Sequence, residues 1–261
     1  PVVTVIVPGR DVAAYAAEAL ASLRAQSLRA WRAILVDDGS LDDTGAVFAA
    51  AASADPRFTV VTHPVPRGLS AARNTGLDLV DTPFVAFLDA DDVFTPTALE
   101  RLVETLTRSG SDVVVGAYVR LRADETGRYA PGDVQPWVRA STDPERIGTS
   151  LSEHPELSGN VVAWSKLSRV ELWRRTGLRF PEGKLYEDQL VAQRLYTTAR
   201  AVDVIPDVVV HWRERAEGTS VTQHKNLLPV PTDHLDALSG GLAALEAPGH
   251  PPPTKPSPPT R

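Results

Sequence analysis

Two clusters of aspartate follow apolar runs in the first half of the sequence. Asp37 and Asp38 come directly after one run, and Asp89, Asp91 and Asp92 come after another. Like charges this close repel one another, and a divalent cation held by hard oxygen ligands would remove that repulsion. In an extended segment Asp89 and Asp91 would leave the backbone on one face. A solvated acidic turn is the other explanation that the residues alone allow.

The second half of the sequence offers a different set of groups. Glu187 and Asp188 stand at the start of a predicted helix, where the helix dipole alone favours acidic residues. His211 ends the last apolar run, and Arg213 and Arg215 follow it. The histidine at this strand end is either structural or a metal ligand.

The elements that must position these groups follow a simple pattern in the first half. Predicted strands alternate with predicted helices, in the order 2–7, 12–23, 33–36, 44–52, 58–61, 70–79, 84–88, 97–106 and 113–115. This alternation is typical of a mostly parallel sheet with helices on both faces. Ligands of such sheets bind at the carboxyl ends of the strands, so the two aspartate clusters should share one crevice.

The pattern is weaker further along the chain. Residues 123–158 are rich in Gly, Pro and charged residues and are expected to be irregular. After them the sequence predicts a strand, two helices and a final pair of strands, at 161–164, 166–175, 187–197, 201–205 and 208–212. Seven prolines crowd residues 248–261, so this end is expected to be disordered and is given no role.

The composition narrows the function classes. The chain has 261 residues, a net charge of −6 and no cysteine, which argues against nucleic-acid binding and excludes thiolate metal sites. No stretch reaches the roughly 18 apolar residues that a membrane span needs, and no leader is recognised. The expected location is cytoplasmic, with contact at the inner face of the membrane left open. Oligomeric state has no signal in the sequence.

Six short motifs carry a resemblance to a known family. "VTVIVP", "LVDDGS", "GLSAARNTG", "FLDADD", "WSKLSR" and "LYEDQ" occur in order between residues 2 and 222. In order and spacing they resemble family 2 glycosyltransferases of the GT-A fold. The resemblance implies an inverting transfer of a sugar from a nucleotide sugar, with a UDP-sugar as the expected donor. The acceptor would be a hydroxyl of a glycan, a teichoic-acid-like or polyol-phosphate polymer, or another cell-surface molecule.

The same resemblance implies a division of the chain. Residues 1–115 would form the nucleotide-sugar-binding half of one GT-A domain, and residues 116–225 its acceptor-side and catalytic half. Residues 226–261 would be a C-terminal extension. The segment 213–222 is expected to order over the donor, because its arginines have no obvious acidic partner until a diphosphate arrives.

Roles for single residues also follow from the resemblance. Asp188 would be the general base, with Glu187 orienting it or the acceptor. Asp91, Asp89 and His211 would hold Mn²⁺ or Mg²⁺. The nucleotide sugar would be bound by Pro8, Arg10, Asp38, Arg73, Asp89, Ala90, Arg213 and Arg215.

The sequence departs from the family pattern at two places. "PGRD" puts Arg10 and Asp11 where an aromatic residue and an amide are expected, and Pro66 stands where an asparagine is frequent. Both departures put the identity of the nucleotide in doubt. Trp164 and Lys166 occupy acceptor-side positions of the family, but a core tryptophan beside a solvated lysine explains them equally well.

Other function classes were weighed against this one. A catalytically idle, carbohydrate-binding or scaffolding domain of the same fold stays open. Nucleotidyltransferases and dehydrogenases would need a Gly-rich phosphate loop after the first strand, and "VPGRD" has a single glycine.

Overall fold

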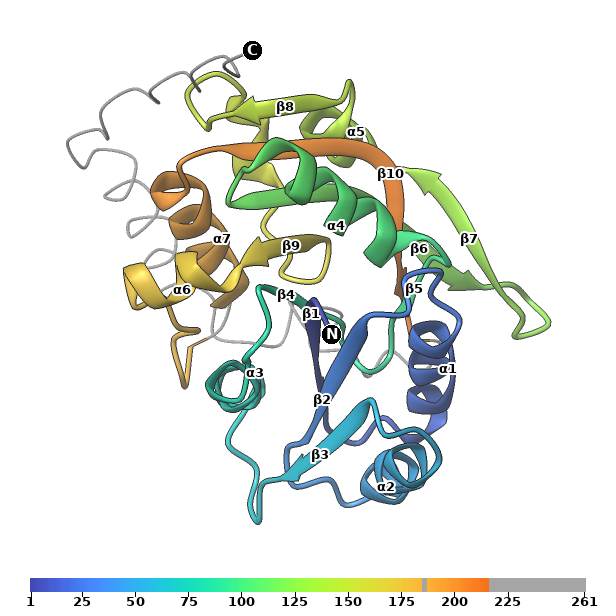
Figure 1. Ribbon diagram of the computed structural model, residues 1–261. Coiled ribbons are helices and arrows are strands. Elements are labelled where there is room, and N and C mark those ends of the chain that lie inside the picture. The colour runs from blue at the N-terminus through green and yellow to red at the C-terminus, as the bar shows by residue number, and fades with distance from the viewer. Residues whose placement is uncertain (185–186, 216–261) are drawn as a thin grey trace.

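The computed structural model describes residues 1–184 and 187–215 (Figure 1). The first half alternates strands and helices as predicted, with one short additional strand. Its elements are β1 (Val3–Gly9), α1 (Ala13–Arg24), β2 (Trp31–Asp37), α2 (Thr44–Ala54), β3 (Phe58–Thr62), α3 (Leu69–Asp78), β4 (Phe84–Phe87), β5 (Val93–Phe94) and α4 (Ala98–Ser109). The second half comprises β6 (Val113–Ala123), β7 (Tyr129–Val134), α5 (Pro136–Thr142), β8 (Arg146–Thr149), η1 (Pro155–Gly159), β9 (Lys166–Arg169), α6 (Val170–Thr176), α7 (Glu187–Thr198) and β10 (Val202–Arg213).

Within the described residues the strands form one ten-stranded sheet of order β3-β2-β1-β4-β9-β6-β10-β5, with β7 beside β6 and β8 beside β10. Strand β1 pairs in parallel with β2 and with β4, and β6 pairs in parallel with β10. Strand β9 runs antiparallel between β4 and β6. The chain leaves β1 toward β2 on one side and later returns to β4 on the other. Such a reversal leaves a ligand crevice at the carboxyl end of β1, as expected for this α/β class.

Two apolar layers cover the sheet. Helices α1, α2 and α4 pack on one face, and α3, α6 and α7 pack on the other (Figure 1). Because side chains alternate along a strand, Val5 of β1 belongs to the first layer and Ile6 to the second. Helix α3 lies very close to β1, since a Cβ on Gly76 would come within 2.4 Å of Ile6. This close approach holds α3 over the end of the strand.

Residues 123–158 are more regular than the sequence predicts. They contain β7, α5, β8 and η1. Strand β7 pairs with β6, and β8 pairs with β10. The expectation of an irregular excursion was therefore wrong. Strand β7 forms a hairpin with the preceding β6, and β8 pairs with the distant β10, so pairing rather than local composition determines these strands.

Two boundaries in the second half also differ from the prediction. Residues 161–164 are not a strand; the strand is β9, which starts at Lys166 where a helix was expected, and α6 begins only at Val170. A run of four residues is too short for periodicity to separate strand from helix. The two final strands are one strand, β10, with an irregular register between Ile205 and Val208. Pro206 lies at this bulge, where a missing N–H is tolerated.

The predicted division at residue 115 falls within β6, and one sheet continues across it. The roles assigned to the two halves stay predictions. The extension 226–261 lies outside the described residues. Within the described ranges no helix combines the length and apolar character needed to cross a bilayer.

Candidate active site

Three aspartates lie in the turn after β4: Asp89, Asp91 and Asp92, called here the turn carboxylates. The Asp92 N–H donates to the Asp89 carbonyl at 2.9 Å, so the segment turns and does not continue extended as expected. Asp89 is bound by Arg73 at 2.9 Å, and Asp91 is bound by Arg215 at 2.7 Å. Asp92 is buried, and its Oδ1 accepts the backbone N–H of Arg213 at 2.8 Å.

The electrostatics of this turn favour an additional cation. Burial raises the pKa of Asp91; Arg215 opposes that effect, and Asp89 adds to it. The pKa of Asp92 lies well above its ordinary value because of burial and the neighbouring charges of Asp91 and Asp89. A divalent cation would stabilise the ionised forms. The donor set fits Mg²⁺ or Mn²⁺ bound by one or two carboxylates together with phosphate oxygens.

The expected third metal ligand is not brought into this group. His211 lies within β10, where it pairs with Val93 of β5. Burial lowers the pKa of His211, which favours the neutral imidazole that can bind a metal. Across the described ranges, however, no group of three or more His, Asp or Glu side chains is arranged to hold an ion. Metal binding by Asp89, Asp91 and His211 stays a prediction.

Arg73 of α3 is the centre of the site. Its side chain is 1% exposed and contacts Asp89, Glu187 at 3.2 Å, and Asp188. Burial disfavours its charge, but Asp188, Asp89 and Glu187 outweigh burial and raise the pKa of Arg73. One permanently charged guanidinium therefore links the turn carboxylates to the predicted base. The Gly76 contact with β1 explains how α3 reaches this position.

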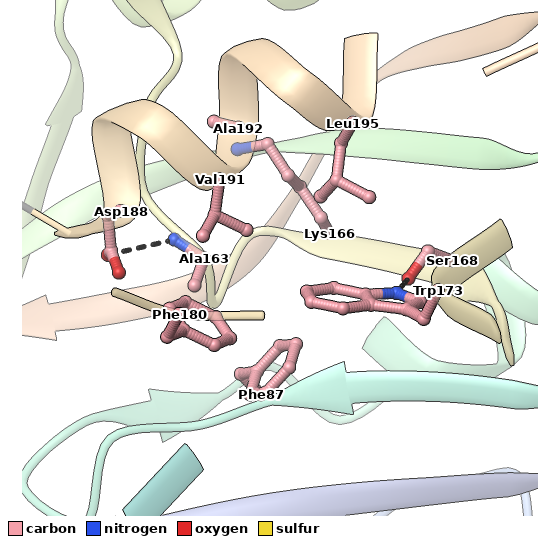
Figure 2. A pocket seen from close by; sticks show the side chains of 10 residues that line it. All are labelled: Phe87, Ala163, Lys166, Ser168, Trp173, Phe180, Asp188, Val191, Ala192 and Leu195. Carbon is pink, nitrogen blue, oxygen red and sulfur yellow. Dashed lines mark hydrogen bonds between the residues drawn. The ribbon is translucent and has the colours of Figure 1, made fainter. Parts of the chain in front are cut away.

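Glu187 and Asp188, called here the helix carboxylates, begin α7. Asp188 accepts from Arg73 through Oδ1 and from the Ala163 N–H through Oδ2, the latter at 3.1 Å (Figure 2). Burial raises the pKa of Asp188, while Arg73 acts in the opposite direction. Burial and the charge of Asp188 together raise the pKa of Glu187 to about 7. Both acids lie at the start of a helix, as the sequence predicts, but their catalytic roles stay predictions.

Asp38 directly follows β2, the strand that pairs with β1. Its carboxylate accepts from His63 Nδ1 at 2.7 Å, from the Arg67 N–H at 2.8 Å and from the Gly68 N–H at 2.7 Å. Burial would raise the pKa of Asp38, but these donors prevail and lower it. Asp38 thus anchors residues 63–68 beside the crevice. Base recognition by this carboxylate stays a prediction, and much of its accepting capacity is already used.

His63 was missed in the sequence, where it gave no signal of a role. It is buried, and its second ring nitrogen lies 3.0 Å from the Thr75 hydroxyl of α3. The usable signal was its position: it follows β3 directly and so lies at the same sheet edge as Asp38. Gly39 supports this arrangement, because a Cβ there would come within 2.8 Å of the Pro66 nitrogen.

The remaining residues predicted to bind the donor, Pro8, Ala90 and Arg10, lie around the end of β1. The Ala90 N–H donates to the Pro8 carbonyl at 3.2 Å, which joins the β1 end to the aspartate turn. Arg10 is half-exposed, and its Nε lies 3.6 Å from Asp11. The guanidinium of Arg10 is therefore at the surface, and its predicted role in binding the nucleotide sugar is untested.

The premise about the C-terminal arginines was wrong. Arg213 is buried and pairs with Glu18, and its guanidinium lies 4.3 Å from the Tyr129 ring centroid. Arg215 pairs with Asp91. Both arginines have acidic partners within the protein, because β10 carries them back to the turn after β4. Residues 216–222 of the expected ordering segment, like Tyr186, lie outside the described residues.

Lys166 and Trp164 fit neither of their expected descriptions fully. Trp164 is buried, with its ring 4.7 Å from that of Tyr118, so it is a core residue. Lys166 is 3% exposed, not solvated. It lines a small cavity together with Asp188, Phe180 and other residues of β4, α6 and α7 (Figure 2). No sequence pattern indicated this buried amine.

Comparison with known proteins agrees with this geometry. The family described as Glycosyl transferase family 2 matches residues 4–158. Glycosyltransferase GlyA of Streptococcus pneumoniae serotype 4 is 28% identical over 251 residues, which cover 95% of this chain and 35% of GlyA. Succinoglycan biosynthesis protein ExoU of Rhizobium meliloti is 36% identical over 203 residues, covering 76% of this chain and 58% of ExoU. This chain thus spans only part of either relative.

Among solved structures, S. aureus TarS 1–349 in complex with UDP-GlcNAc superposes with a TM-score of 0.79. The sequences are 22% identical, and the alignment covers 94% of this chain and 66% of that one. At this identity the likeness establishes the fold. The family match over residues 4–158 reaches more than half of the sequence and includes both aspartate clusters and Arg73. The chain belongs to glycosyl transferase family 2.

Proposed function

We propose that this protein is an inverting, metal-dependent glycosyltransferase that moves a sugar from a nucleotide sugar to a hydroxyl of a cell-surface glycan or polymer. The observation that carries the proposal is Arg73, which joins a carboxylate of the aspartate turn to the carboxylates at the start of α7. The donor site and the base would therefore lie on opposite sides of one fixed charge.

The donor would bind in the crevice at the ends of β1, β2 and β4. Asp89 and Asp91 would hold the cation, which when bound offsets the negative charge that grows on the leaving diphosphate. Arg215, which pairs with Asp91, supplies a further positive charge for the phosphate oxygens. Pro8, Ala90 and the segment anchored by Asp38 border the same crevice and would contact the nucleoside.

The acceptor hydroxyl would be deprotonated by Asp188. Burial raises the pKa of Asp188 and makes it a stronger base than a solvated aspartate, while Arg73 favours its ionised form. The Arg73 and Ala163 donors fix both carboxylate oxygens in orientation. The hydroxyl oxygen then forms the new bond to the anomeric carbon as the bond to the diphosphate breaks on the opposite face. Glu187 would orient Asp188 or the acceptor.

The donor and acceptor classes rest on the relatives. UDP-GlcNAc bound to TarS supports a UDP-sugar as the donor, and the role of ExoU in succinoglycan biosynthesis supports a polysaccharide acceptor. Since this chain spans 35% of GlyA and 58% of ExoU, the activity of a longer protein is part of the proposal.

The test is release of nucleoside diphosphate from UDP-glucose, UDP-GlcNAc and GDP-mannose, each with Mn²⁺, with Mg²⁺ or with EDTA. We expect one UDP-sugar to be cleaved and EDTA to stop the cleavage. Binding of a nucleotide sugar without release, in the presence of a panel of oligosaccharide acceptors, would instead identify a catalytically idle domain.

A further inference from the structure

A buried lysine, Lys166, lines the same cavity as the predicted base Asp188. Lys166 is on β9, which the sheet order places between β4 and β6, and its ammonium reaches back to residues 160–163. It is 3% exposed. A charged amine in such a place costs free energy unless its protons are satisfied. None of the steps proposed above uses it.

The donors of Lys166 are directed at one short segment. Its Nζ donates to Asn160 Oδ1 at 2.9 Å and to the Val162 carbonyl oxygen, and it lies 5.6 Å from the Tyr196 ring centroid, within cation–π range. Tyr196 also donates its hydroxyl proton to the Asn160 carbonyl at 2.6 Å. The segment that leads to Ala163 is therefore held from β9 and from α7.

The decisive feature is a single peptide group. The Val162 carbonyl that accepts from Lys166 and the Ala163 N–H that donates to Asp188 belong to the same peptide bond. A trans peptide is planar, with its C=O and N–H pointing in opposite directions. The ammonium thus binds the negative end of this dipole and the carboxylate binds the positive end. Such an arrangement polarises the peptide and strengthens both hydrogen bonds.

We propose that Lys166 is a positioning residue that fixes the orientation of Asp188 through the peptide between Val162 and Ala163. The proposal rests on the function proposed above, in which Asp188 is the base. Lys166 does not touch the acceptor. It fixes the plane of the one backbone donor on Asp188 Oδ2, while Arg73 fixes Oδ1.

Lys166 and Asp188 also interact through their charges. Burial lowers the pKa of Lys166 to about 7, and the charge of Asp188 acts in the other direction and favours the charged amine. The charged groups that act on Asp188 come from every element around it: Arg73 of α3, Asp89 after β4, Lys166 of β9 and Glu187 of α7. Removing Lys166 takes away one of the two cations in this set, so the pKa of Asp188 should rise further.

The first variant is Lys166→Met, which keeps the length and removes the donors. Nucleoside diphosphate release should fall between about 10-fold and 10²-fold, as expected for a displaced catalytic group. Affinity for the nucleoside diphosphate, measured with UDP and Mn²⁺, should stay unchanged. The acid limb of the pH–rate profile should move to higher pH. Thermal stability should be equal or greater, because replacing a buried charge by a well-packed apolar side chain is often stabilising.

The matched control is Ser168→Ala on the same strand. Ser168 lines the same cavity and accepts from Trp173 Nε1 at 2.7 Å, and among the described residues it has no hydrogen bond to residues 160–163. Its loss leaves the indole N–H without its partner, so this variant should lose stability and keep the pH–rate profile. If both variants lost stability and rate alike, Lys166 would be a structural residue and the proposal would be overturned.

A second measurement does not need activity. In protein labelled with ¹⁵N-alanine, the Ala163 amide should exchange with solvent faster in Lys166→Met than in the wild type, and equally slowly in Ser168→Ala. An unchanged Ala163 amide overturns the positioning role, whatever the rates are. A faster amide in a protein that cleaves none of the nucleotide sugars would support the positioning role and refute the proposed function.

Discussion

The turn carboxylates and the helix carboxylates are equally crowded, but they are neutralised in different ways. Asp188 is held by Arg73 from the middle of α3 and by a backbone N–H, both built into packed elements. Asp91 is held by Arg215, the last residue of the described range, beyond the end of β10. Asp92 has one oxygen without a hydrogen-bond partner among the described residues. The partners of Asp188 thus lie within packed elements, whereas Asp91 depends on an arginine beyond the last strand and Asp92 keeps one oxygen unpaired within the described part of the chain.

Asp188→Asn should have the largest effect and should separate the role of the helix carboxylates from that of the turn carboxylates. An amide cannot accept the acceptor proton, so transfer should fall by on the order of 10² to 10⁴. Binding of nucleotide sugar, measured by calorimetry, should stay close to that of the wild type. Glu187→Gln is the control, with a smaller expected loss of rate. Wild-type transfer by a folded Asp188→Asn protein would move the base to Glu187, and a collapse of donor affinity would assign α7 to the nucleotide site.

Arg73→Met tests whether one charge joins both groups. It leaves Asp89, Glu187 and Asp188 without their shared cation, which should cost about 3 to 5 kcal/mol in the free energy of unfolding. In the wild type the pKa values of Glu187, about 7, and of Asp188 already lie above their ordinary values, and removing Arg73 should raise both further, so the loss grows as pH rises through these folded-state values. Denaturation should therefore show a smaller deficit at pH 5 than at pH 7.5.

The control for this variant is Arg57→Met, which removes a more exposed arginine paired with Asp55 at 2.7 Å. Its effect should be about 1 kcal/mol or less and should change little between these pH values. Equal deficits for the two arginine variants would mean that Arg73 is an ordinary surface-type ion pair.

Asp91→Asn should act on binding, where Asp188→Asn acts on rate. The metal would lose an anionic ligand, so affinity for UDP in Mn²⁺ should fall by about 10-fold or more, toward the value in EDTA. Asp207→Asn is the control, since Asp207 of β10 pairs with Arg101 of α4 at 2.8 Å and has no predicted role in the site. Equal affinity in Mn²⁺ and in EDTA for the wild type would refute a metal-dependent donor site.

The smallest expected effect concerns Lys166 and the pH dependence of stability. The pKa of Lys166 is about 7 in the folded protein and has an ordinary value of 10.5, so the unfolded chain binds the proton more tightly. The free-energy cost of burying the charged amine is therefore largest below pH 7, and it decreases as pH rises from 7 toward 10.5. Between pH 7 and pH 9, the free energy of unfolding of the wild type should therefore increase by about 1 kcal/mol or more relative to that of Lys166→Met. A difference that does not vary with pH would mean that Lys166 titrates normally.

The same comparison explains how much of the site was visible in the sequence. The turn carboxylates were predictable because a continuous apolar run, typical of a buried strand, ends at them, and parallel strands bring their carboxyl ends together. Asp188 and Glu187 were placed by a family motif. Arg73 was assigned to the nucleotide pocket, but its contact with both groups depends on how closely Gly76 lets α3 approach β1. No local pattern encodes such a distance.

The residues that escaped prediction share a cause. Lys166 is buried because β9 inserts between two distant strands, and a lysine gives no apolar signal for that position. His63 is buried because residues 63–68 fold back on Asp38. Both positions depend on long-range pairing, and propensity and periodicity describe only neighbours along the chain.

The insertion of β9 also bears on folding. Strand β4 has β1 on one side and β9 on the other, and β9 is separated from β4 by more than a third of the described chain. A fragment that stops at residue 115 would leave β4, with its buried run of Phe84, Val85, Ala86 and Phe87, as an uncovered edge. Exposed apolar edges of this kind pair with other molecules and aggregate. During synthesis the first half must therefore wait for β9 before its sheet is closed, which makes that interval the point at which the nascent chain most needs protection by a chaperone.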